Sequence, residues 1–145
     1  MAVAQVVLDT DILSAIMRQN PVVIPKAREY LAEHSRFTFS IITRFEILRG
    51  LKAKGATTQV RVFDEFCARN MILPLTDEVV VKAADIYADL RGRGVLIGDA
   101  DILIAASALV QGFGVATNNE NHFQRIRDSV AGRGSVPLQV QNWLK

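Results

Sequence analysis

The chain of 145 residues is long enough to form one domain with a substantial hydrophobic core, and half of its residues are hydrophobic. Charged residues make up 22% of it, which excludes an intrinsically disordered protein, and the net charge of +2 permits a nucleic-acid partner without arguing for one. The single cysteine, Cys67, cannot form an internal disulfide, and the sequence shows neither a signal peptide nor an apolar run of membrane-spanning length. We therefore expect one cytoplasmic domain, residues 1–145, that makes no contact with a membrane.

The hydrophobic pattern predicts strands that alternate with helices. A valine-rich run at 3–8 is typical of a strand buried on both faces, and it ends at Asp9, Thr10 and Asp11. Further strands are predicted at 37–41, 71–75, 115–117 and 138–140. Helices are predicted after Asp11 and at 24–34, 42–54, 57–70, 77–91 and 101–110. This alternation indicates an α/β fold in which helices cover both faces of a mainly parallel sheet.

Caps and inward faces follow from the same pattern. Ser40 or Thr43 can cap the helix at 42–54, and Thr76 can cap the one at 77–91. Residues 132–135 are predicted to form a loop, and Trp143 to pack the end of the chain against the domain. The side chains expected to face inward are Ile42, Phe45, Leu48 and Leu51, then Val62, Phe63, Phe66 and Cys67, then Val80, Ala83, Ala84 and Tyr87.

The helix at 101–110 is apolar around almost its whole circumference, which predicts that it is packed on more than one side. Its only carboxylates, Asp99 and Asp101, stand at its beginning. We interpret Asp99 as the N-cap, which leaves Asp101 free for a functional role. A buried helix with acids only at its start indicates a site at the rim of the sheet, where the carboxyl ends of parallel strands bind ligands.

Four more polar residues have both a structural and a functional interpretation. Asp9 follows a buried strand and can be a site residue or a helix cap, and Asp11 can be a second site acid or a complement to the helix dipole. Glu46 lies at the edge of an apolar helix face and can serve a site or pair with Arg49 three residues later. Asn119 follows the strand at 115–117 and can belong to the site or to a turn.

The residue types of this set predict the ion that it would bind. His34 and His122 are isolated in polar segments and are interpreted as surface residues, and no Cys or His cluster indicates zinc. Asp9, Glu46 and Asp101 offer only oxygen ligands. Such ligands suit Mg²⁺ or Mn²⁺, which enzymes use in phosphate chemistry.

Four segments, taken together and in order, resemble the PIN-domain ribonucleases, specifically the VapC-type toxins of bacterial toxin–antitoxin pairs. These segments are VVLDTDILS, SIITRFEILRG, IGDADILIAASAL and VATNNENHF, followed by a terminal Trp143. The resemblance implies a PIN-like three-layer sandwich. It implies that Asp9, Glu46 and Asp101 bind the metal and carry catalysis, and that Thr10 and Thr117 line the pocket. Asn119 stands where many relatives have a fourth acid, Asp11 where the family usually has Asn, and Asp99 at a variable position.

The function implied by this resemblance is that of a Mg²⁺- or Mn²⁺-dependent endoribonuclease, the toxin of a toxin–antitoxin pair. Asp9 and Asp101 would hold an ion that activates water for in-line attack on a phosphodiester, and Glu46 would orient the ion or its water. The resemblance also implies a homodimer, for which the helices at 24–34 and 57–70 offer apolar faces, and an antitoxin laid across the active-site groove. Cationic side chains can contact phosphates or merely make helices soluble: Arg18, Arg44, Arg49 and Lys52.

Two other interpretations stay open at this point. A catalytically inactive PIN-like module that only binds RNA or protein is supported by the amide at Asn119. A phosphatase of the haloacid-dehalogenase type is suggested by Asp9-Thr10-Asp11, which imitates its DxDx(T/V) loop. That motif has Thr or Val where this chain has Leu13, and no partner lysine is evident.

Overall fold

A computed structural model of the protein describes residues 3–131 and 137–145. The strands are short, and the helices that separate them have eight to sixteen residues. The strands are β1 (Val6–Leu8), β2 (Thr38–Ser40), β3 (Met71–Leu73), β4 (Gly114–Ala116) and β5 (Val140–Gln141). The helices are α1 (Thr10–Met17), α2 (Val23–His34), α3 (Ile41–Ala53), α4 (Thr57–Ala68), α5 (Asp77–Gly92), α6 (Asp99–Gln111) and α7 (Glu120–Ala131).

The five strands form one sheet in the order β3-β2-β1-β4-β5, and every neighbouring pair is parallel. β1 is central, with Leu8 opposite Phe39 of β2 on one side and opposite Ala116 of β4 on the other. Because all the strands run the same way, their carboxyl ends meet at one edge of the sheet. The predicted parallel α/β fold is confirmed.

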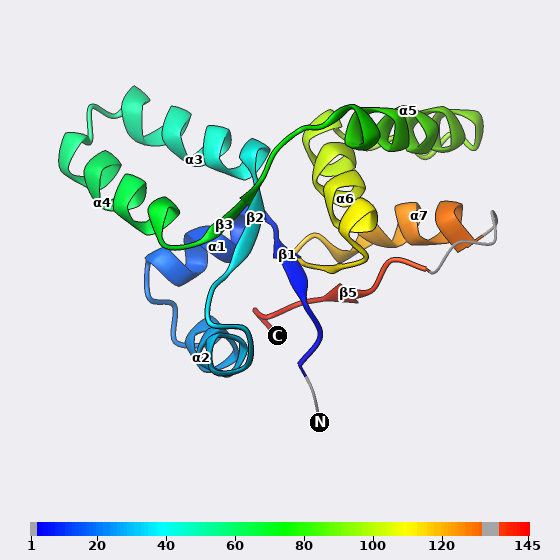
Figure 1. Ribbon diagram of the computed structural model, residues 1–145. Coiled ribbons are helices and arrows are strands. Elements are labelled where there is room, and N and C mark those ends of the chain that lie inside the picture. Colours follow the sequence, from blue (N-terminus) through cyan, green and yellow to red (C-terminus); the bar gives the residue numbers. More distant parts are fainter. Residues whose placement is uncertain (1–2, 132–136) are drawn as a thin grey trace.

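Two hydrophobic cores lie on opposite faces of this sheet. Val7 points into a core built from α5, α6 and α7, whereas Val6 and Leu8 point into a core built from α1, α2 and α4. Figure 1 shows these two groups of helices on either side of the strands, which gives the predicted three-layer sandwich. Trp143 is buried in the second core against Tyr30, so the end of the chain packs down as predicted.

The predicted inward face of α5 is wrong by about one residue of helix rotation. α5 buries Val79, Ala83, Ile86 and Leu90, while Val80 and Tyr87 of the predicted face are 50% and 39% exposed. Both sets have helical spacing, and the apolar run at 79–81 hides which of them faces the core. Phe45 and Val62 were also predicted to be buried, and they are 56% and 53% exposed.

Two of the three N-cap assignments predicted for α3, α5 and α6 are confirmed. Ser40 caps α3 through the amide of Ile42, and Thr76 caps α5 through the amide of Val79, as predicted. The predicted cap at Asp99 is wrong, because Gly98 occupies the N-cap position of α6 and Asp99 is its exposed first residue.

The region after β4 contains a helix that the sequence interpretation overlooked. The residues after Asn119 form α7, whose Phe123 and Ile126 are buried three residues apart. The loop predicted at 132–135 lies outside the described residues. Within the described ranges, no helix combines the length and the hydropathy that crossing a bilayer requires.

Candidate active site

The candidate site begins where β1 and β4 end side by side. Because Leu8 pairs with Ala116, the residues that follow them, Asp9 and Thr117, are brought together. The Thr117 hydroxyl donates to Oδ2 of Asp9 at 2.7 Å, and the Thr10 amide donates to Oδ1 at 2.8 Å. Asp9 is thus confirmed as the N-cap of α1, and its carboxylate is only 6% exposed at the rim of the sheet, where its role as a site residue stays a prediction.

The electrostatics of Asp9 are those of a crowded acidic site. Burial, followed by repulsion from Asp11, raises the pKa of Asp9 to about 7, although the hydrogen bonds from Thr117 and Thr10 act in the opposite direction. Repulsion from Asp101 adds to the increase. Asp11 and Asp101 therefore lie within electrostatic range of Asp9, and the three acids form one cluster.

Asp11 does more than complement the dipole of α1. Its Oδ1 accepts the Ile12 amide at 2.7 Å, and its Oδ2 accepts the Asn118 amide at 3.0 Å across the end of β4. Burial raises the pKa of Asp11, these backbone donors lower it, and repulsion from Asp101 raises it. Asp11 thus ties the start of α1 to the segment between β4 and α7.

Glu46 of α3 joins the site through Thr10. The Thr10 hydroxyl donates to Oε1 of Glu46 at 2.6 Å, while the guanidinium of Arg49 lies 3.8 Å from Oε2. The pairing of Glu46 with Arg49 is therefore confirmed, and it coexists with a link to Asp9 through Thr10, while a role of Glu46 in a site stays a prediction. Arg49 is well exposed beside this carboxylate and stays a candidate phosphate contact.

Arg44 was predicted as a phosphate contact, and the structure engages it elsewhere. Its Nη2 forms an ion pair with Asp64 of α4 at 3.0 Å, and its guanidinium lies over the Phe63 ring. Arg44 therefore fastens α3 to α4. The two remaining cationic candidates, Arg18 at the end of α1 and Lys52 of α3, are exposed.

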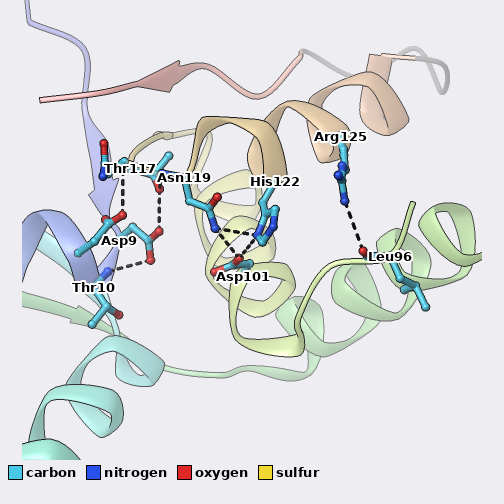
Figure 2. Close-up of polar contacts among 10 residues, drawn as sticks. Asp9, Thr10, Leu96, Asp101, Thr117, Asn119, His122 and Arg125 are labelled. Atoms are coloured by element: carbon cyan, nitrogen blue, oxygen red, sulfur yellow. Dashed lines mark hydrogen bonds and ion pairs between the residues drawn. The ribbon is translucent and has the colours of Figure 1, made fainter. Parts of the chain in front are cut away.

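Asp101 meets two residues of the segment after β4 (Figure 2). Nδ1 of His122 lies 2.7 Å from Oδ2 of Asp101, and the amide nitrogen of Asn119 lies 2.7 Å from Nδ1 and 3.5 Å from Oδ2. The interpretation of His122 as an isolated surface residue is wrong. The signal that could have located it is its spacing of three from Asn119, which places both on one side of a helical turn once α7 is assigned.

Comparison with known proteins identifies the fold that carries this site. Residues 6–129 match the family model of the PIN domain. The chain belongs to the PIN domain family. It is 28% identical over 138 residues to the protein named Ribonuclease VapC2 of Haemophilus influenzae, a match that covers 94% of this chain and 96% of that one. It is also 33% identical over 89 residues to Ribonuclease VapC1 of Methanocaldococcus jannaschii, which covers 61% of this chain and 63% of that protein.

Solved structures show the same PIN domain architecture. The DNA-bound VapBC of Salmonella typhimurium aligns with a TM-score of 0.78 at 25% identity, over 97% of this chain and 99% of that one. VapBC-1 of nontypeable Haemophilus influenzae aligns with a TM-score of 0.76 at 26% identity, over 96% and 98%. Membership of this family removes the basis for the haloacid-dehalogenase interpretation.

The acidic side chains that the structure describes in this PIN domain have the ligand chemistry that a divalent cation prefers, but they are not arranged around a single point. Its acids offer the oxygen ligands that Mg²⁺ or Mn²⁺ prefers, and a cation would relieve the repulsion that raises the pKa of Asp9. Within residues 3–131 and 137–145, no three His, Cys, Asp or Glu side chains are arranged to hold one ion. Asp101 contacts His122, and Glu46 contacts Thr10. Metal binding therefore requires at least some of these carboxylates to turn toward a common point.

Proposed function

We propose that this PIN domain is an endoribonuclease that depends on Mg²⁺ or Mn²⁺ and acts as the toxin of a toxin–antitoxin pair. The observation that carries the proposal is the group of three acids formed by the buried Asp9 at the carboxyl end of β1 and the half-buried Asp11 and Asp101, in which burial and like charges raise the pKa of Asp9 to about 7. Such a cluster is costly in isolation and becomes favourable when it holds a cation. Relatives named Ribonuclease VapC support the same reaction class.

The residues of the site would have the following roles in catalysis. Asp9, Asp101 and Glu46 would hold the cation, with Asp11 as a further carboxylate. A divalent cation supplies positive charge that activates water and stabilises the charge developing in in-line phosphodiester displacement. Thr10 and Thr117 keep the Asp9 carboxylate oriented, and Arg49 is placed to contact a phosphate beside Glu46.

Single acid-to-amide changes test the proposed reaction. Asp101→Asn and Glu46→Gln are each expected to lower the cleavage rate about a hundredfold or more, because each removes a charge that would hold the cation. Cleavage of total RNA with Mg²⁺ or Mn²⁺, followed on a gel, measures this effect. Asp99→Asn is the matched control. It sits in the same turn of α6 but is exposed, so it should keep most of the activity.

Two outcomes of that assay would contradict parts of the proposal. Loss of activity in Asp99→Asn equal to that in Asp101→Asn would show that the two acids have been assigned the wrong roles. RNA binding by the wild type without cleavage under any metal condition would favour the alternative of an inactive PIN-like binding module, which the amide at Asn119 continues to support.

We also propose that an antitoxin segment lies in a groove beside the acids. A pocket of about 470 Å³ opens between α1, α3 and α4, and its lining includes Thr10 and Glu46. Apolar residues form much of its lining, including Met17, Ile47, Leu51 and Val62, and Arg18 and Lys54 lie among them. An apolar segment carrying acidic residues would match both features, and the VapBC assemblies among the structural neighbours support a protein partner.

Val62→Glu tests this groove. The side chain is 53% exposed, so the change leaves the core intact while placing a charge in the groove. We expect the inhibition constant of the small protein encoded beside this chain to rise at least tenfold in a cleavage assay. Val22→Glu is the control, because Val22 is equally exposed but lies outside the groove. Equal inhibition of the Val62→Glu variant and the wild type would contradict this location.

The proposed homodimer has a further candidate face besides the helices predicted from sequence. Large exposed apolar side chains are found on α3, at Ile41 and Phe45, just before α5, at Leu75, and near its start, at Val80 and Val81. Ser40 pairs with Leu73, so Ile41 and Leu75 follow neighbouring strands. We therefore place the dimer contact on α3 and α5. Sedimentation of a monomer alone at micromolar concentration would contradict the dimer.

A further inference from the structure

We infer that His122 is a positioning residue, which fixes the Asp101 carboxylate so that one of its oxygens is directed to the cation while the other is held by the protein. This inference rests on the proposed function, because it gives Asp101 a metal to face. The sequence alone did not predict a functional role for His122.

The contact joins the first turns of two helices. Asp101 stands in the first turn of α6 and His122 in the first turn of α7, and Nδ1 lies 2.7 Å from Oδ2. The two side chains are 20% and 36% exposed, so their contact is shielded from water on most sides.

The proton in this contact can be assigned by elimination. Nδ1 carries either one hydrogen or one lone pair, so it cannot donate to Asp101 and accept from the Asn119 amide at the same time. A lone pair at 2.7 Å from an ionised carboxylate oxygen would be repelled. Nδ1 therefore carries the hydrogen and donates to Oδ2. The Asn119 amide is then oriented with its oxygen toward Nδ1–H, an assignment that follows from the network of contacts.

The consequence is that the two oxygens of Asp101 have different tasks. His122 donates to Oδ2, and no hydrogen bond to Oδ1 is found among the described residues, so Oδ1 is the oxygen left for a cation. A carboxylate fixed in this way loses less side-chain freedom when it binds an ion. Residues that orient a metal-binding side chain typically change metal affinity or activity by 10–100-fold when they are removed.

The experiment replaces the donor and then restores it. His122→Leu fills a similar space without a donor, whereas His122→Asn keeps an N–H close to the position of Nδ1. We expect the dissociation constant for Mn²⁺, measured by spin-resonance titration without RNA, to rise about tenfold in His122→Leu and to return to within about threefold of wild type in His122→Asn. In cleavage at fixed, subsaturating Mn²⁺, kcat should fall in His122→Leu while KM for RNA stays unchanged.

Controls separate failure of this inference from failure of the proposed function. His34 is the only other histidine, and it packs on Tyr30 and not beside the acids. His34→Leu should therefore leave Mn²⁺ binding unchanged. Asp101→Asn should weaken Mn²⁺ binding strongly. If Asp101→Asn has no effect, the proposed metal site itself is wrong.

Three results would overturn the role of His122 while leaving the metal site intact. The first is wild-type Mn²⁺ affinity in His122→Leu beside impaired Asp101→Asn. The second is failure of His122→Asn to recover affinity while its circular dichroism and melting match the wild type. The third is a directly coordinated nitrogen in the pulsed spin-resonance spectrum of bound Mn²⁺, which would make His122 a ligand of the metal.

Discussion

Replacing Asp9 with asparagine is expected to abolish RNA cleavage and, at the same time, to raise the melting temperature of the metal-free protein at neutral pH. The asparagine can keep both hydrogen bonds of the site. Its Oδ1 can accept the Thr10 amide, and its Nδ2 can donate to the Thr117 hydroxyl oxygen. Asparagine is also a good N-cap residue, so α1 keeps its start. What the variant lacks is the charge that would hold the cation.

The stability gain follows from the raised pKa of Asp9, about 7 instead of 3.8. Below pH 3.8 the carboxyl is protonated in the folded and the unfolded chain, and it carries no penalty. Between pH 3.8 and about 7 the unfolded chain ionises while the folded protein keeps the proton, so the free energy of unfolding falls as pH rises. One pKa unit corresponds to ~1.4 kcal/mol, so the penalty above pH 7 is at most on the order of 4 kcal/mol.

Melting curves between pH 4 and pH 8 in EDTA measure this difference. Asp9→Asn should melt within a degree or two of wild type near pH 4 and roughly 5–10 °C above it at pH 7.5, at about 2–4 °C per kcal/mol for a domain of this size. Millimolar Mn²⁺ should then stabilise the wild type more than the variant, because a ligand that binds only the folded state stabilises it. A variant that melts below wild type at pH 7.5 would show that the Asp9 carboxylate stabilises the metal-free protein, and it would contradict this prediction.

Gly114→Ala is expected to give the largest loss of stability among the glycine substitutions. A Cβ built on Gly114 would lie 2.8 Å from the carbonyl oxygen and 3.1 Å from the Cβ of Gln139, beside β5. Neither strand can move away without breaking the β4–β5 ladder, which pairs Val115 with Val140. Overpacking of this kind typically costs about 1–3 kcal/mol. We expect urea denaturation to show a loss of at least 2 kcal/mol.

Gly92→Ala is the matched control for that substitution. A Cβ at Gly92 meets nothing within 4 Å, and this glycine is the last residue of α5. Alanine there should be neutral or stabilise by a few tenths of a kcal/mol. Similar losses of stability in both variants would indicate a general sensitivity to glycine replacement and would remove the close approach of β4 and β5 as the explanation.

Much of the fold could be predicted because short, buried parallel strands have a local signature. Runs of valine and phenylalanine that end in Asp or Ser fix β1 and β2, and the caps Ser40 and Thr76 fix the starts of α3 and α5. The inward face of α5 could not be predicted. Because residues 79–81 are all valine, two alternative apolar faces have helical spacing. Packing against α6 decides that the face containing Val79 is buried.

The same distinction applies to the site. Asp9 could be located, because it directly follows a strand and parallel strands end at one edge, whereas Thr117 was assigned to the pocket by the family resemblance. The contact of His122 with Asp101 could not be predicted without α7, since it depends on how two helix starts meet in space. The ion pair between Arg44 and Asp64 could not be predicted from the sequence either, because it depends on how α3 packs on α4.

The hydrogen bond between Thr117 and Asp9 joins residues 108 positions apart, and this separation has a consequence for the synthesis of the protein. Chains are synthesised from the N-terminus. A contact between residues far apart in the sequence also requires closure of a long loop, which costs conformational entropy. Asp9 emerges from the ribosome early, whereas β4 and α7 emerge much later. The site is therefore assembled only after β4 has been made, so a truncated or stalled chain that ends before β4 lacks Thr117 and Asn119 and cannot complete it.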